Sequence, residues 1–219
     1  MDQKYDDMID YYTTWGHQIK TPIAAMKLHL QNEDSPLSFK LSTDLFHIEQ
    51  YVEMVMTYLR LDSNNTDYVF HEVDLDDVIR QVIKKFAPEF IERKIKLNYE
   101  SISAFIISDE KWLSFVIEQV VSNALKYTPK GSISIYLKDK NILCVQDTGI
   151  GIASEDLPRV FEKGYTGYNG RMDSKASGLG LYLCKRVCDN LGHDISIDSI
   201  IDKGTTVYID LSQVQLEKE

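Results

Sequence analysis

Three side chains in the middle of the sequence have types and spacing that suit a nucleotide with its metal ion. Gln119, Asn123 and Lys126 stand four and three residues apart, so on a helix all three project from one face. Neutral oxygen ligands beside an ammonium group suit a hydrated Mg²⁺ and a phosphate tail, because Mg²⁺ in proteins keeps several of its waters. Taken alone, the stripe is better explained as the solvated face of an amphipathic helix.

Two glycine-containing stretches follow. Asp147 ends an apolar, strand-like segment and is followed by Gly149 and Gly151. A carboxylate at a strand end, with backbone able to approach closely, can accept a hydrogen bond from an exocyclic amine such as that of adenine. The stretch Gly178-Leu179-Gly180 opens a helix-like segment, where backbone N–H groups and the helix dipole favour phosphate. Each signal alone is weak, and a tight turn explains the first one better.

A histidine near the N-terminus is the candidate nucleophile. His17 lies in a run with helical spacing and is followed by Gln18, Lys20 and Thr21. A neutral imidazole nitrogen is a competent nucleophile near neutral pH. A single histidine on a helix is more often structural, so this interpretation depends on the motif around it.

Composition limits the classes of function. With 34 acidic and 24 basic residues, the 219-residue chain has a formal net charge of −10, which argues against nucleic acid as a partner. The cysteines lack the spacing of a zinc site, and Cys184 and Cys188 are interpreted as core thiols in a reducing compartment. A window of about 18 apolar residues and a signal peptide are both absent, which predicts a soluble chain inside the cell.

The sequence pattern divides the chain into two domains, 1–66 and 67–219. Up to Leu61 the apolar residues recur at helical spacing, and Ser35-Pro36 predicts the start of a second helix. The inner face of that helix is predicted to carry Leu41, Leu45, Ile48, Val52, Val55 and Leu59. Because a lone hairpin cannot bury both sides of its apolar stripe, we expect a homodimer that forms a four-helix bundle. The polar run 61–67 is the predicted linker.

Beyond the linker, strands and helices are mixed. Helices are predicted from Asp74 to about Arg93, over 110–127 and up to about Asn190, and Pro88 predicts a kink or an early end of the first. Strands are predicted at 96–100, 104–108, 132–138, 142–146, 194–200 and 205–211, and 147–177 is irregular. The fold class is therefore α+β, with helices on one face of a sheet.

The motifs occur in the order found in histidine kinases. The stretches 123–128, 147–151, Phe161, 178–181 and Gly204-Thr205 resemble the N, G1, F, G2 and G3 boxes of histidine kinase ATPase domains. His17-Gln18-Ile19-Lys20-Thr21-Pro22 resembles the H box of their dimerisation and phosphotransfer domain. The resemblance covers essentially the whole chain and implies a Bergerat-type ATP-binding fold. The runs 12–22 and 161–167 are most similar to intramembrane-sensing kinases of Gram-positive bacteria, many of which work beside a peptide-antibiotic transporter.

The resemblance implies a role for each motif residue. His17 would accept the γ-phosphoryl group of ATP, with Gln18, Lys20 and Thr21 beside it, and would pass it to an aspartate of a response-regulator receiver domain. The implied cofactor site comprises Gln119 and Asn123 for Mg²⁺, Lys126 for the phosphates, Tyr127 beside the nucleotide, Asp147 for the adenine amino group, and Gly149, Gly151, Gly178, Leu179 and Gly180. The stretch 161–177 would be the ATP lid, with Lys163, Arg171 and Lys175. The implied location is the cytoplasmic side of the cell membrane, with the anchor outside this sequence.

Three positions depart from the family pattern. Gln18 replaces an acid beside the phosphoacceptor, which predicts slow autophosphorylation and puts phosphatase activity in doubt. Gln119 replaces an asparagine and keeps an oxygen ligand on a longer arm. Ala176 replaces the first glycine of the G2 box and should stiffen the lid.

Two other functions are compatible with part of this pattern. One is a degenerate kinase that binds nucleotide and signals by conformation, against which the retained motif residues argue. The other is an ATPase of the gyrase or chaperone type, which needs a catalytic glutamate to activate water. Glu118 is out of register with the stripe of Gln119 and Asn123, and such ATPases lack an H box.

Overall fold

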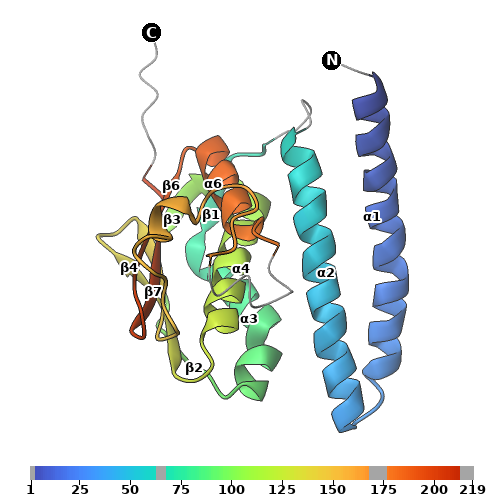
Figure 1. Cartoon of the computed structure of the whole chain (residues 1–219), viewed down its shortest axis with the longest axis horizontal. Helices are drawn as coiled ribbons and strands as arrows, with labels where there is room; N and C mark the ends of the chain where they lie inside the picture. Colours follow the sequence, from blue (N-terminus) through green and yellow to red (C-terminus); the bar gives the residue numbers. More distant parts are fainter. Residues whose placement is uncertain (1–2, 63–67, 168–176, 213–219) are drawn as a thin grey trace. The chain divides into compact units, whose positions relative to one another are not determined.

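The computed structural model describes residues 3–62, 68–167 and 177–212, and the chain divides into two compact units, Met1–Asp67 and Tyr68–Glu219. In the first unit, α1 (Gln3–Leu30) and α2 (Pro36–Asp62) pack against each other as a hairpin (Figure 1). The predicted start of α2 is confirmed. The Ser38 N–H donates to Ser35 Oγ and the Ser35 N–H donates to Ser38 Oγ, both at 3.1 Å, a reciprocal cap that begins the helix.

The predicted inner face of α2 consists of two neighbouring stripes that differ in exposure. The stripe that contains Leu45, Val52 and Leu59 is 6% to 8% exposed. The stripe that contains Leu41, Ile48 and Val55 is 39% to 43% exposed. The two stripes are offset by four residues and each repeats every seven, so they lie side by side on the helix. The hairpin buries one of them and leaves the other at the surface.

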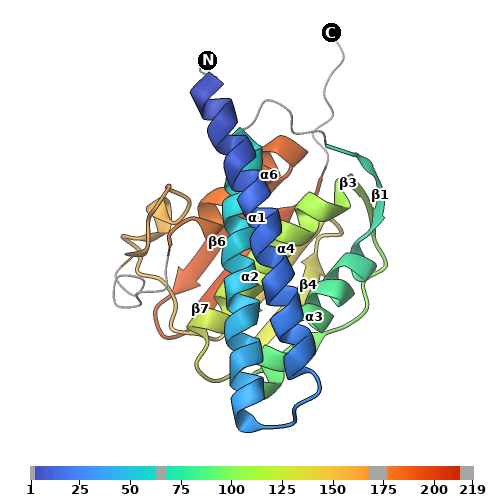
Figure 2. The ribbon, with the colours of Figure 1, turned by 90° about the vertical axis from the view of Figure 1, so that its right-hand side faces the viewer.

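The second unit is the predicted α+β sandwich. Its helices α3 (Leu75–Glu92), α4 (Glu110–Tyr127) and α6 (Gly180–Leu191) lie on one face of a five-stranded sheet (Figures 1 and 2). The sheet has the order β2-β4-β5-β7-β6, in which β2 and β4 run parallel and the other neighbours antiparallel. Its strands are β2 (Lys96–Tyr99), β4 (Ser132–Lys138), β5 (Ile142–Asp147), β6 (Asp194–Ile200) and β7 (Gly204–Asp210).

The core of this unit lies between the helices and the sheet. Its largest fully buried side chains come from both layers and include Ile79, Phe86, Leu113, Ile117, Ile133, Leu143, Leu183 and Ile209. Asp74 caps α3 as predicted, because its side chain accepts a hydrogen bond from the Asp76 N–H at 3.0 Å. Apolar burial on this scale is the main force that holds the helices against the sheet and so fixes the strand ends where the site lies.

Some predictions at the element level were wrong. Of the kink or early end predicted at Pro88, the early end does not occur, since the helix continues to Glu92. The strand β1 (His71–Asp74) was missed; it pairs antiparallel with β3 (Phe105–Ser108) in a separate two-stranded sheet. The short helix η1 (Leu157–Arg159) lies within the stretch predicted as irregular. Among the residues that the structure describes, no helix has the length and apolar character needed to cross a membrane.

Candidate nucleotide site and phosphoacceptor

The Asp147 carboxylate stands at the end of β5 and is 7% exposed. Its Oδ1 accepts hydrogen bonds from the Gly149 N–H at 2.8 Å and from the Thr205 N–H at 3.2 Å. Burial raises the pKa of Asp147 above its usual value, and these backbone donors oppose the rise without cancelling it. Because both donors meet Oδ1, the arrangement leaves Oδ2 suited to accept a hydrogen bond from a ligand amine.

The loop after Asp147 approaches its neighbours so closely that glycine is required. A Cβ on Gly149 would lie 2.3 Å from the carbonyl oxygen of Tyr127, which also accepts the Ile150 N–H at 3.1 Å. Gly151 has a φ of +71°, and a Cβ there would lie 2.2 Å from the carbonyl oxygen of Ile200. The loop is therefore fixed between the end of α4 and the turn that joins β6 to β7.

The predicted amide stripe of α4 meets the start of α6. Gln119 is buried, and its Oε1 lies 3.1 Å from the position that a Cβ on Gly180 would take. Asn123 and Lys126 are half-buried on the same helix, and the Lys126 ammonium lies 5.2 Å from the centre of the Tyr127 ring. The structure thus brings Gln119 to the glycine segment that the sequence linked with phosphate.

The two ends of the predicted lid are joined. The Gly164 N–H donates to the Gly178 carbonyl oxygen at 3.0 Å, and a Cβ on Gly178, whose φ is +67°, would lie 2.4 Å from the Gly164 carbonyl carbon. Helix α6 begins beyond this contact, and Leu179 at its N-cap makes no side-chain cap. Its first N–H groups are therefore suited to an anion. Of the lid residues, Phe161 is half-buried and Lys163 exposed, whereas Arg171, Lys175 and Ala176 lie outside the described residues.

The described residues contain no cluster of three histidine, cysteine, aspartate or glutamate side chains that could cage a metal ion. Gln119 and Asn123 offer amide oxygens from one helix face. This donor set fits an ion such as Mg²⁺ that keeps several waters and is bound largely by the phosphates of its nucleotide. It does not fit a tightly held structural metal.

His17 lies on α1 with its side chain exposed to solvent, as do its neighbours Gln18 and Thr21. Lys20 faces the other helix of the hairpin and bonds Glu53 on α2, whose second oxygen lies 3.7 Å from Arg60 Nη1. The sequence placed Lys20 beside His17 in a chemical role. In the hairpin its ammonium group joins the two helices, and its chemical role stays a prediction.

The residue before His17 makes a close contact between α1 and α2. Gly16 is buried, and a Cβ on it would lie 2.2 Å from Sδ of Met56, which is 1% exposed. The backbone of α1 therefore touches the Met56 side chain directly. This contact fixes how far α1 stands from α2 at the position where His17 is presented.

Several residues that shape the site or its unit were not identified from the sequence. Gly149 and Thr205 belong to predicted motifs, but the hydrogen bonds from their N–H groups to Asp147 were not predicted, because backbone atoms carry no residue-type signal. Ser199 Oγ accepts the Ile152 N–H at 2.8 Å. His193 is buried with Nε2 2.9 Å from Ser108 Oγ, and His71 Nδ1 lies 3.1 Å from the Val69 carbonyl oxygen.

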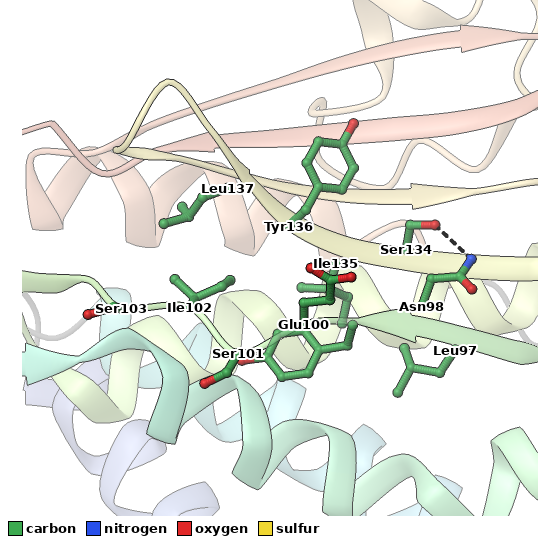
Figure 3. Close-up of a pocket in the computed structure, with 11 residues that line it drawn as sticks. Leu97, Asn98, Glu100, Ser101, Ile102, Ser103, Ser134, Ile135, Tyr136 and Leu137 are labelled. Carbon is green, nitrogen blue, oxygen red and sulfur yellow. Dashed lines mark hydrogen bonds between the residues drawn. The ribbon is translucent and has the colours of Figure 1, made fainter.

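A separate groove lies at the β2 edge of the sheet. It encloses about 720 Å³ and is lined by residues 97–103 and 134–137 (Figure 3). Asn98 Nδ2 donates to Ser134 Oγ at 3.1 Å, between strands β2 and β4 (Figure 3). None of the predicted nucleotide-site residues lines this groove, so it is a different feature of the surface.

The fold and the site together define a class. Residues 108–215 match the family described as histidine kinase-, DNA gyrase B- and HSP90-like ATPase. The chain is similar in fold to full-length ShkA solved with AMPPNP, with a TM-score of 0.63 and 21% identity over 94% of this chain and 47% of that one. It is also similar to the histidine kinase AdeS of Acinetobacter baumannii, with a TM-score of 0.55 and 23% identity over 90% of this chain and 98% of that one.

Curated relatives narrow the class. The chain is 36% identical to sensor histidine kinase YxdK of Bacillus subtilis, over 93% of the chain and 65% of the relative. It is 33% identical to sensor protein BceS of Halalkalibacterium halodurans, over 94% and 62%, and 33% identical to sensor protein kinase GraS of Staphylococcus aureus, over 90% and 58%. The chain belongs to the sensor histidine kinases and corresponds to their catalytic portion. It spans 58% to 65% of the length of these relatives.

Proposed function

We propose that the chain binds ATP with Mg²⁺ in its second unit and transfers the γ-phosphoryl group to His17 in its first, as the catalytic part of a two-component sensor kinase. The observation that carries this proposal is the Asp147 carboxylate, buried at the end of β5 and held at one oxygen by two backbone N–H groups. Such an acceptor suits the adenine amino group, and the exposed imidazole of His17 suits an incoming phosphate.

Each site residue then has a defined task. Asp147 orients the base, the N-terminus of α6 at Gly180 receives phosphate oxygens, and Lys126 neutralises their charge. Gln119 and Asn123 would hold Mg²⁺, which when bound supplies charge neutralisation to the transferred group. A neutral ring nitrogen of His17 attacks the γ-phosphorus while the bond to the β–γ bridging oxygen breaks, so that ADP leaves and phosphohistidine forms.

The partners are part of the same proposal. The hairpin, assigned with its linker to 1–66, would dimerise through the exposed stripe of Leu41, Ile48 and Val55, and 67–219 would be the ATP-binding domain. The phosphohistidine would pass its phosphoryl group to an aspartate of a receiver domain. We further propose, from the family resemblance alone, that the whole protein is anchored in the cell membrane and works beside a peptide-antibiotic transporter.

The decisive test is phosphate incorporation from γ-labelled ATP with Mg²⁺. His17→Gln should abolish labelling and leave ATP binding unchanged, and the label on the unmodified chain should be acid-labile and base-stable. His29→Gln is the matched control, because His29 is another exposed histidine of α1. Substantial labelling of His17→Gln would refute the assignment, and ATP binding without any labelling would favour the degenerate kinase.

The ATPase alternative is disfavoured by the state of Glu118. Its Oε2 lies 2.6 Å from the Lys85 ammonium on α3, so this carboxylate is engaged in an ion pair between helices. A hydrolytic ATPase of this class needs a carboxylate poised to activate water. Phosphate release that outpaces phosphohistidine formation in the chain would restore this alternative.

A further inference from the structure

The hydroxyl of Thr128 is an unexplained polar group beside the nucleotide site. Thr128 follows α4 as its C-cap and is 0% exposed. Its Oγ1 lies 2.9 Å from the position that a Cβ on Gly149 would take, and Asp147 Oδ1 lies 2.8 Å from the same point. Yet among the residues that the structure describes, no atom stands in hydrogen-bond geometry with this hydroxyl. It is close enough to lower the pKa of Asp147 without forming a regular bond.

An unpartnered buried hydroxyl is costly to a folded protein. It loses its bonds to water and gains none in return, and a valine of the same shape would avoid that loss. Packing therefore gives no reason for threonine at this position. A reason appears only if the hydroxyl acquires a partner in another state of the site. The neighbouring Asp147 carboxylate is the group that a ligand would reorganise.

We propose that Thr128 is a positioning residue for base recognition: its hydroxyl donates to the Asp147 carboxylate when an adenine nucleotide is bound, and thereby favours ATP over GTP. This inference rests on the proposed function. Adenine presents an amine donor to Oδ2 of Asp147. Guanine presents a carbonyl in that place, beside a ring N–H that only a pivoted carboxylate could reach. A third donor on the carboxylate, added to the N–H groups of Gly149 and Thr205, prevents that pivot.

The surroundings of Asp147 make the Thr128 hydroxyl important for the charge state of this carboxylate. Burial raises the pKa of Asp147, and the groups that lower it are the N–H of Gly149, the N–H of Thr205 and the Thr128 hydroxyl. Thr128 is thus the one side chain among the described residues that lowers it, and no charged side chain takes part. The nearby cation Lys126, on the last turn of α4, lies over the Tyr127 ring. Thr128→Val should therefore raise the pKa of Asp147 further. As pH is lowered, the variant should then begin to lose ATP affinity at a higher pH than the unmodified chain.

The test uses the full chain with Thr128→Val and Thr128→Ser. Dissociation constants for ATP and GTP are measured across a pH series, together with thermal unfolding without ligand. Thr128→Val should weaken ATP binding about 10- to 100-fold, the loss typical of a hydrogen bond to a charged group. GTP binding should be unchanged or stronger, because the Asp147 carboxylate can then pivot. Its melting temperature without ligand should be equal to or above that of the unmodified chain. Thr128→Ser should retain most of the ATP affinity.

Thr57→Val is the matched control, since Thr57 is a buried threonine of α2 in the other unit, and it should alter neither constant. The proposal is overturned if Thr128→Val keeps the ratio of ATP to GTP affinity. It is also overturned if that variant unfolds or melts several degrees lower, because the hydroxyl would then serve the fold. A chain that fails to prefer ATP before any substitution would instead refute the adenine role of Asp147 and the proposed function with it.

Discussion

Asp147 carries the residue-scale chemistry of base recognition, because two backbone donors fix one of its oxygens. In Asp147→Asn the amide oxygen would take the place of Oδ1, and the amide N–H₂ would then face the adenine amine, donor against donor. We expect ATP affinity to fall about 10- to 100-fold, with a change in the free energy of unfolding of about 1 kcal/mol or less. Isothermal titration and thermal unfolding of both proteins measure these quantities.

The pH dependence of the same pair of proteins provides the control. Burial raises the pKa of Asp147 above its value in the unfolded chain. The ligand-free fold therefore loses stability as pH rises through this raised pKa and the carboxylate ionises. ATP binding needs the ionised form, so ATP affinity should decline as pH falls through the same raised pKa. Asp147→Asn should lack this decline. An identical acid response in the two proteins would assign the titration to another group.

Gly149 acts through the space that it leaves open. In Gly149→Ala the new Cβ would collide with the Tyr127 carbonyl oxygen and press on both Asp147 and Thr128. We expect a loss of about 1–3 kcal/mol in the free energy of unfolding and at least tenfold weaker ATP binding. Gly192→Ala is the control, because Gly192 has a φ of +71° but no atom within 4 Å of its Cβ position. It should lose about 1 kcal/mol of stability with ATP binding intact.

At the scale of elements, the contact between α1 and α2 beside His17 should affect autophosphorylation, because it sets the position of His17. Gly16→Ala places a methyl group against Sδ of Met56. Alanine favours the helix by about 1 kcal/mol relative to glycine. The overlap with Met56 should nevertheless lower the free energy of unfolding by about 1–3 kcal/mol and displace α1. Autophosphorylation of His17 should slow while ATP affinity is unchanged. Both can be measured on the same preparation, by labelling under saturating ATP and by titration.

A double-mutant cycle tests whether this effect arises at Met56. Met56→Ala alone should destabilise the hairpin by about 2–5 kcal/mol, since Met56 is almost completely buried. Adding Gly16→Ala to that variant should cost less than adding it to the unmodified chain, because the space is then open. Strict additivity would show that the glycine is needed for another reason, such as bending of α1 near Pro22.

The sequence predicted best those elements whose signals are local. Helix α4 and the strands β4 and β6 match their predicted bounds residue for residue, because periodicity and flanking turn formers mark them. Strand β1 was missed because four residues with one buried position show no alternation. Its partner β3 is also distant in the sequence, since the whole of α3 lies between the two strands. For α2, spacing shows that both stripes are apolar but not which one the hairpin covers.

The candidate site was predictable to the extent that it depends on side chains. Asp147, Gly149 and Gln119 were identified by type and spacing, and the structure places each at the end of β5 or on α4 near Gly180. The contact between Asp147 and the Thr205 N–H joins residues 58 positions apart through a backbone atom, so residue types could not reveal it. The packing that buries Thr128 was equally invisible, because residue type does not show whether a threonine after a helix is buried.

At the scale of the whole molecule, the exposed stripe of α2 predicts how copies of the chain assemble. Leu41, Ile48 and Val55 repeat every seven residues on a surface helix, the spacing of a helix–helix seam. Ile48→Glu would bury a charge at the centre of that seam, which is strongly unfavourable without a partner. We therefore expect light scattering to show a dimer for the unmodified chain and a monomer for Ile48→Glu, with ATP affinity unchanged because the nucleotide site lies in the other unit.

The control for this prediction makes the same substitution on the second unit. Ile91 on α3 is 76% exposed, so Ile91→Glu places an equal charge on the surface without touching the hairpin. It should remain dimeric and fully active.

If autophosphorylation requires two hairpins in one bundle, Ile48→Glu should also lose labelling of His17 in proportion to its loss of dimer. Raising the protein concentration should then restore both the dimer and the labelling. A concentration-independent monomer of the unmodified chain, or a dimer that survives Ile48→Glu, would show that the exposed stripe serves another contact.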